Sequence, residues 1–231
     1  MKAGIIAAGE GTRLRADGIS VPKPLVQVNG VPLIERLLNS FHRNHITEAV
    51  CIVNESSIEV KKFVEGKSFK IPVHFIVKST PSSMHSLFEL SQFLVDDRFL
   101  LTTVDSIFQD HEFSHFLKYS ESRPTADGIL AVTNFIDDEN PLYVQMNSEN
   151  RITSFKKMEQ SAWVTGGLYI FSSRIFKERE YVLHRRIERL RNFLAHLLEK
   201  DYRLEGFSFS KIVDVDHLQD ISKAEELLKS I

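Results

Sequence analysis

The chain has 231 residues, 42% of them hydrophobic, which is enough to bury the core of one complete domain. Its formal net charge of -2 gives no global field that would attract nucleic acid or an anionic membrane. The first apolar segment is too short for a signal peptide and no apolar run is long enough to cross a bilayer, so we expect a cytoplasmic protein. The single cysteine, Cys51, excludes an internal disulfide framework, and its apolar neighbours predict a buried thiol.

The first half of the chain alternates between short apolar segments and helical patterns. Segments rich in Val, Ile and Phe predict buried strands over residues 2–7, 49–53, 73–77 and 99–104. Apolar residues recur at helical spacing over residues 33–41, 58–64 and 87–94. This alternation predicts an α/β fold with right-handed crossovers and a doubly wound, mostly parallel sheet. Its ligand crevice should lie at the carboxyl ends of the strands.

The second half has a looser pattern. Strand-like segments at residues 128–133, 143–146, 151–155 and 167–171 are separated by polar turns, which predicts antiparallel additions to the sheet. Single apolar stripes predict one helix over residues 187–198 and another from about His217 to the C-terminus. We therefore expect a single domain over residues 1–231, with residues 126–231 covering a pocket and ending in a closing helix.

A glycine loop follows the first expected strand. Gly9 and Gly11 let the backbone turn tightly and bring its N–H groups close to phosphate oxygens. Arg13 adds a planar donor fork suited to phosphate, and Lys23 is a compact charge held between two prolines. The glycines alone could equally form a structural turn.

Two other phosphate-binding motifs fit poorly. A Walker loop would need Gly-Lys followed by Ser or Thr, and a dinucleotide fingerprint would need a small residue at Leu14. The Val53-Asn54 pair also provides no acidic residue at the end of the second strand, which argues against a nicotinamide-dependent oxidoreductase.

The combination of an apolar strand, G-x-G-T-R-L and P-K-P-L resembles the nucleotidyltransferase family that makes nucleotide sugars and related activated phosphates. The resemblance implies the mixed, Rossmann-like sheet of nucleotide-diphospho-sugar transferases, which is also called glycosyltransferase-A-like. It assigns nucleotide binding to residues 1–125 and acceptor binding to residues 126–231. The segment 15–20 departs from the family, whose members often carry proline and threonine there.

The resemblance assigns catalytic roles to Arg13, on the leaving pyrophosphate, and Lys23, on the α-phosphate. The remaining residues expected to contact the nucleotide come from the glycine loop and from the segment before the helix at 87–94: Ala7, Ala8, Gly9, Gly11, Thr12, Ser82 and Ser83. Many relatives have glycine at the two serine positions. The serines could also act as a helix N-cap, so the base is left open.

Mg²⁺ is the cofactor that the resemblance implies. Asp105 follows a strand at the mouth of the sheet, where a carboxylate could bind Mg²⁺ or serve as a solvated turn residue. A second ligand is expected near the C-terminus, where register against the family favours Asp216 over Asp214. Asp216 could instead cap the final helix.

The acceptor site is the least defined. The resemblance assigns acceptor contacts to Lys156, Lys157 and Gly167, although the two lysines replace the family's glutamate-lysine pair. Four arginines lie in or just before the helix expected at 187–198: Arg185, Arg186, Arg189 and Arg191. They could form a solvated helix face, contact the acceptor phosphate or contact another subunit.

These features predict a magnesium-dependent enzyme that transfers a nucleotidyl group from a nucleoside triphosphate to a phosphorylated acceptor and releases pyrophosphate. A sugar 1-phosphate is the first expectation for the acceptor. The alternatives are a cytidylyltransferase acting on phosphocholine or another small phosphorylated alcohol, and an inactive nucleotide-sugar sensor. Family members are often homo-oligomers, but the sequence does not decide the oligomeric state, the base, the acceptor or the pathway.

Overall fold

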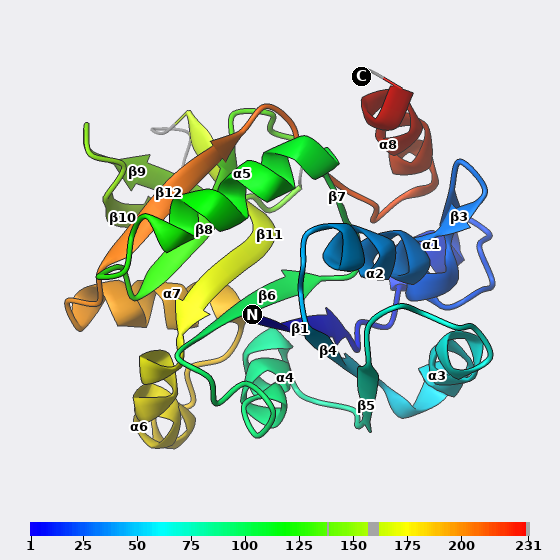
Figure 1. Cartoon of the computed structure of the whole chain (residues 1–231), viewed down its shortest axis with the longest axis horizontal. Helices are drawn as coiled ribbons and strands as arrows, with labels where there is room; N and C mark the ends of the chain where they lie inside the picture. Colours follow the sequence, from blue (N-terminus) through cyan, green and yellow to red (C-terminus); the bar gives the residue numbers. More distant parts are fainter. Residues whose placement is uncertain (138, 157–161, 230–231) are drawn as a thin grey trace.

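The protein is a computed structural model that describes residues 1–137, 139–156 and 162–229, and its centre is a nine-stranded mixed sheet (Figure 1). The parallel part of the sheet has the strand order β6-β1-β4-β5. These four strands are β1 (Lys2–Ala7), β4 (Glu48–Val53), β5 (Val73–Val77) and β6 (Arg98–Thr103). Their carboxyl ends therefore share one edge of the sheet, as the doubly wound prediction requires.

Residues on each parallel strand alternate between two hydrophobic cores. In β1, Ala3 and Ile5 belong to one core and Ile6 to the other, and the same alternation recurs along β4. The first core packs under α2 (Leu33–Arg43), α3 (Ile58–Glu65), α5 (Asp110–Glu121) and α8 (Leu218–Lys229). The second packs against α4 (Ser83–Leu90), α6 (Arg179–His184) and α7 (Leu190–Glu199). Helices therefore cover both faces of the sheet (Figure 1).

The second half of the chain extends the sheet beyond β6. β11 pairs antiparallel with β6, β8 and β9. The added strands are β8 (Gly128–Thr133), β9 (Tyr143–Met146), β10 (Ile152–Lys156), β11 (Trp163–Ser172) and β12 (Leu204–Phe209). The antiparallel additions predicted for this half are confirmed, although β12 runs parallel to β8.

Several elements differ from their predicted extent. α4 begins at Ser83 and ends at Leu90, so Phe93 and Leu94 pack from the following turn. α7 begins at Leu190 and excludes Ile187, because the chain turns sharply just before it. α5 and β12 were not predicted. Their apolar residues lie in short or irregular runs, and it is the tertiary packing of Phe116 against Phe207 and Phe209 that brings them together.

Short elements carry the chain around the edge of the sheet. They are α1 (Thr12–Ala16), the hairpin β2 (Gln27–Val28) and β3 (Val31–Pro32), and the pair β7 (Ser106–Ile107) and β13 (Val213–Asp214). The β7–β13 pair returns the C-terminal segment to the end of β6. Within the part of the chain that the structure describes, no helix has both the length and the apolarity needed to cross a bilayer.

Candidate active site

The glycine loop lies at the carboxyl end of β1 and leads directly into α1. Gly11 adopts the left-handed conformation with φ 62°, and a Cβ there would lie 3.3 Å from the Cβ of Lys23. Glycine allows both this conformation and this close approach. Lys23 begins a 3-10 turn between Pro22 and Pro24, so the two halves of the motif pack against each other.

A hollow of about 360 Å³ opens at this edge of the sheet. Six of the seven residues expected at the glycine loop line it: Ala7, Gly9, Gly11, Thr12, Arg13 and Lys23. Asp105 and Asp216 line the same hollow. Ala8 does not, and its carbonyl accepts a hydrogen bond from the Asn54 side chain at 3.2 Å. Thus Ala8 fixes the loop to the neighbouring strand end, whereas the other six border an open space.

Lys23 joins the two predicted metal ligands. Its Nζ donates to Asp105 Oδ2 and lies 2.5 Å from Asp216 Oδ1. Only 10% of the Lys23 side chain is exposed. Burial acts to lower the pKa of Lys23, but the charges of Asp105 and Asp216 outweigh it and the pKa is raised. For Asp105, burial acts to raise the pKa, and the charge and hydrogen bond of Lys23 hold it below its ordinary value. Lys23 and Asp105 are therefore both charged at neutral pH.

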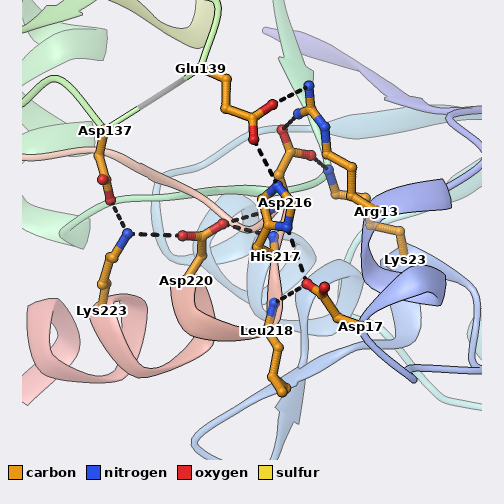
Figure 2. A network of polar contacts seen from close by, with 10 residues as sticks. All are labelled: Arg13, Asp17, Lys23, Asp137, Glu139, Asp216, His217, Leu218, Asp220 and Lys223. Carbon is orange, nitrogen blue, oxygen red and sulfur yellow. Dashed lines mark hydrogen bonds and ion pairs between the residues drawn. The ribbon is translucent and has the colours of Figure 1, made fainter.

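Arg13 reaches over the same hollow. Its Nη1 donates to Asp216 Oδ2 at 2.8 Å, and its Nη2 lies 3.1 Å from Glu139 Oε2. Figure 2 shows that Glu139 also approaches His217, with Oε1 and Nε2 3.3 Å apart. An acceptor-side residue therefore contacts the cation predicted to hold pyrophosphate.

Asp214 and Asp216 have different partners. Asp214 Oδ1 accepts from the Ser106 hydroxyl at 2.7 Å, whereas Asp216 contacts Lys23 and Arg13. Burial, together with the charge of Asp105, raises the pKa of Asp214 to about 7. The geometry thus gives Asp216 the place beside Lys23, in line with the register that the sequence favoured. The Asp216 carboxylate contacts Lys23 and Arg13, whereas the first N–H of α8, that of Leu218, donates to Asp17.

Residues 15–20, the segment that departs from the family pattern, contribute a structural contact through Asp17. Asp17 Oδ2 accepts from the Leu218 backbone N–H at 3.0 Å and contacts His217 Nδ1 at 3.1 Å (Figure 2). The Leu218 hydrogen bond, followed by that from His217, lowers the pKa of Asp17. Sequence reasoning missed this contact, because 201 residues separate Asp17 from the helix it caps. It ties the phosphate-loop region to the segment that carries Asp216.

Gly166 and Gly167 let β11 pass close to the carboxylates. A Cβ on Gly167 would lie 2.2 Å from the Ser106 hydroxyl oxygen, and its φ is 75°. A Cβ on Gly166 would lie 2.2 Å from Ile212 Cδ1. Gly167 therefore has a packing role, and it also lines a second hollow of about 310 Å³ together with Asp105 and Asp216.

The hydroxyls of the two serines predicted to contact the base accept hydrogen bonds from the backbone at the start of α7. Ser82 Oγ accepts from the Arg189 backbone N–H and Ser83 Oγ accepts from the Leu190 backbone N–H, both at 3.2 Å. Neither hydroxyl caps its own helix. Ser83 also lines the second hollow.

The acceptor contacts expected of Lys156 and Lys157 stay a prediction. Lys156 ends β10, where its backbone pairs with Tyr143 of β9. Lys157 lies outside the described residues. Among the described residues, Arg189 and Arg191 are the arginines that line the second hollow. Their crowding on the approach to α7 was visible in the sequence, but their place beside the carboxylates was not.

The residues present suit one Mg²⁺ ion. Asp105 and Asp216 converge on the single Nζ atom of Lys23, so one cation can reach both carboxylates. No group of three or more His, Cys, Asp or Glu side chains in the described parts of the chain could hold a metal. Two carboxylates are nevertheless sufficient for Mg²⁺, which usually takes one or two from the protein and the rest from water and phosphate oxygens.

Comparison with known proteins gives relatives over nearly the whole chain. The bifunctional protein GlmU of Methanocaldococcus jannaschii is 25% identical over 234 aligned positions, which cover 99% of this chain and 54% of GlmU. The D-glycero-alpha-D-manno-heptose 1-phosphate guanylyltransferase of Campylobacter jejuni is 23% identical, covering 77% of this chain and 79% of that protein. The chain spans about half the length of the GlmU relatives it matches.

The fold is shared with a solved enzyme. The inositol-1-phosphate CTP transferase from T. maritima superimposes with a TM-score of 0.83 at 21% identity, covering 99% of this chain and 96% of that one. The family model for Nucleotidyl transferase matches residues 2–230. This match and the fold agree with the strand-end site described above, and the chain belongs to the nucleotidyl transferase family.

Proposed function

We propose that the chain transfers a nucleotidyl group from a nucleoside triphosphate to a phosphorylated acceptor, with release of pyrophosphate. The observation that carries this proposal is the convergence of Lys23, Asp105 and Asp216 beside the glycine loop. Paired carboxylates next to a buried cation and open backbone turns suit a triphosphate bound with a metal ion. Family membership supports the same class of reaction.

In the proposed reaction, an oxygen of the acceptor phosphate attacks the α-phosphorus in line, and the bond from that phosphorus to the pyrophosphate oxygen breaks. The protein forms no covalent intermediate, so its task is alignment and charge neutralisation. Lys23 offsets negative charge on the α-phosphate and the incoming phosphate. Asp105 and Asp216 would hold Mg²⁺, which supplies charge stabilisation to the phosphate oxygens when bound.

Arg13 takes the leaving pyrophosphate in this scheme. Its side chain is 40% exposed, and its guanidinium contacts the carboxylates of Asp216 and Glu139. A triphosphate would replace these contacts with phosphate oxygens, which accept bidentate bonds from arginine equally well. Binding of the nucleotide thus exchanges one set of charge pairs for another.

A sugar 1-phosphate is our first choice of acceptor, supported by the relative from Campylobacter jejuni, which is named for a heptose 1-phosphate. The alternative is cytidylyl transfer to a small phosphorylated alcohol. It has support from the inositol-1-phosphate CTP transferase that shares the fold. A nucleotide-sugar sensor without activity is the third reading.

The test is pyrophosphate release with each of the four ribonucleoside triphosphates and Mg²⁺, against sugar 1-phosphates, inositol 1-phosphate and phosphocholine. Release that requires one triphosphate and one acceptor, and that is lost in Lys23→Ala, supports the transferase and names its substrates. Tight triphosphate binding without release in any combination would favour the sensor.

A further inference from the structure

Two arginines stand between the catalytic carboxylates and an outer hollow. Arg189 and Arg191 line the second hollow together with Asp105 and Asp216. They also line a neighbouring hollow of about 580 Å³ that contains neither carboxylate. The other residues of this outer hollow are Glu139, Asn140, Pro141, Tyr143, Glu188 and Asn192. An acceptor whose phosphate lies near Asp105 would therefore extend past the two guanidinium groups.

The guanidinium groups are available to a ligand. Arg189 is exposed, and the described residues provide no hydrogen bond or ion pair to its side chain. Arg191 is half-buried, and its Nη2 donates to the Asn140 carbonyl at 2.7 Å. This bond uses a neutral acceptor and leaves further donors on the same group. Burial raises the pKa of Tyr169 to about 12 and the charge of Arg191 opposes this rise, so that charge acts inside the second hollow.

The backbone holds Arg189 in an unfavourable conformation. Its φ of 68° and ψ of 141° lie where residues other than glycine are rare. The hydroxyls of Ser82 and Ser83 hold this turn through the N–H groups of Arg189 and Leu190. Glycine would relieve the strain at position 189 but would remove the cation from the hollow.

The reacting phosphate has its own cations at the other end. Lys23 lies between Asp105 and Asp216, and these carboxylates suit Mg²⁺. Arg189 and Arg191 add two positive charges at the outer hollow. The acidic residues that border the same hollow are Glu139 and Glu188. Glu139 is already paired with Arg13 and His217. The far end of the acceptor thus meets two arginine charges that the proposed reaction does not require.

We propose that Arg189 and Arg191 bind an acidic group that the acceptor carries in addition to its reacting phosphate, either a carboxylate or a second phosphate. This inference rests on the proposed function, because it names the acceptor class of the same site. Planar guanidinium groups bind both kinds of anion through paired hydrogen bonds.

The experiment compares acceptors that differ in one acidic group. Glucose 1-phosphate is set against glucuronic acid 1-phosphate and glucose 1,6-bisphosphate, and glycerol 3-phosphate is set against 3-phosphoglycerate. The full chain is tested as wild type, Arg189→Gln, Arg191→Gln and the double variant. Arg185→Gln is the matched control, because Arg185 is exposed, stacks on Tyr181 and lines neither hollow. Binding is measured by calorimetry and turnover by pyrophosphate release.

We expect the wild type to prefer a member with the additional acid, and each single variant to lose about 10- to 100-fold in affinity for that member only. The carboxylate and bisphosphate arms identify the preferred anion. The inference would be overturned if a variant lost the same affinity for the acceptor that lacks the additional acid, or if neither variant lost affinity. Either result would leave the transferase proposal intact. Absence of any preference in the wild type would overturn it as well. If no acceptor yields pyrophosphate, the proposed function fails, and the calorimetric comparison still decides whether the arginines bind the second acid.

Discussion

The edge of the sheet where we propose nucleotide binding, called the nucleotide edge, and the side where we propose acceptor binding, called the acceptor side, are built in different ways. Lys23 and Asp105 sit on short connections that follow the ends of parallel strands, and Asp216 is returned to them by the β7–β13 pair. The acceptor side is formed by Thr165, Gly167 and Tyr169 of β11, the loop that carries Glu139 and the turn before α7. Strand ends are rigid and loops vary freely, so one scaffold can keep its chemistry while its recognition changes.

The two regions also differ in burial. The side chains of Lys23 and Asp105 are 10% and 20% exposed, and they neutralise each other. Arg189 is exposed, and the residues described provide it with no counter-ion. A change at the nucleotide edge should therefore abolish the reaction for every acceptor, whereas a change at the acceptor side should alter which acceptor is used.

The largest effect should come from Lys23→Ala. Removing this buried charge leaves two carboxylates unneutralised next to the α-phosphate, and we expect turnover to fall by about 10³-fold or more with every acceptor. Pyrophosphate release under saturating substrates measures it, with circular dichroism to check the fold. Lys78→Ala is the control, because Lys78 pairs with Glu89 away from the hollow. A fall confined to one acceptor would contradict the separation of the two regions.

Substituting Asp216 or Asp214 should lower turnover by less than Lys23→Ala does, and by different amounts. Asp216→Asn should lower turnover by roughly 10²-fold and raise the Mg²⁺ concentration needed for half-maximal rate. Asp214→Asn should cost less than about 10-fold, since an amide can still accept the Ser106 hydrogen bond. Titration of Mg²⁺ with each variant checks both statements. The reverse order would make Asp214 the ligand.

The contact between Glu178 and α7, the helix that begins directly after Arg189 and contains Arg191, should stabilise the fold in a pH-dependent way. Glu178 accepts from Tyr202 at 3.0 Å and lies 2.7 Å from His196 Nε2 of α7. Burial acts to raise the pKa of Glu178, but these hydrogen bonds outweigh it and the pKa is lowered. Because the folded-state pKa is below the unfolded one, the stabilisation is present above the unfolded value and is lost as the pH falls through the folded value.

Glu178→Gln should therefore lower the free energy of unfolding by about 1 kcal/mol at pH 7, and by progressively less as the pH is reduced below about 4. Urea unfolding at several pH values measures this difference. A difference that stays constant down to the lowest pH would show that the charge of Glu178 contributes nothing. Glu180→Gln, two residues further along the chain in the first turn of α6, serves as a surface control.

The smallest effect is expected at Glu139, where the two regions touch. Glu139→Gln should free Arg13 from one of its two carboxylates and lower the KM for the triphosphate by about 2- to 5-fold, because an exposed ion pair contributes at most about 1 kcal/mol. The kcat should remain unchanged. A higher KM would indicate that Glu139 positions Arg13 instead of competing for it.

The sequence predicted the parallel core and most of the nucleotide edge, because both depend on local patterns. Apolar strands buried on both faces, a glycine loop after the first strand and Asp105 after a later strand can each be recognised without knowing the rest of the fold. The place of Asp216 just before the final helix could be read in the same way, but the cap of that helix by Asp17 could not.

The acceptor side could not be predicted because its contacts join segments far apart in sequence. Ser83 and Leu190 are 107 positions apart, and Asp17 and Leu218 are 201 apart. The four arginines gave a visible pattern, but nothing local distinguished Arg189 and Arg191, which line the hollow, from Arg185 and Arg186. Serines at 82 and 83 were expected at the base, and their contacts with α7 emerge only from the tertiary structure.

The most direct test of the central claim is to follow a triphosphate labelled at the α-phosphorus and, separately, at the γ-phosphorus, with the acceptor that gives the fastest pyrophosphate release. We expect the α-label to enter a product joined to the acceptor and the γ-label to leave in pyrophosphate, with both outcomes lost in Lys23→Ala. Transfer of the γ-label to the acceptor, or an α-label that is recovered only in free nucleotide, would contradict nucleotidyl transfer at this site.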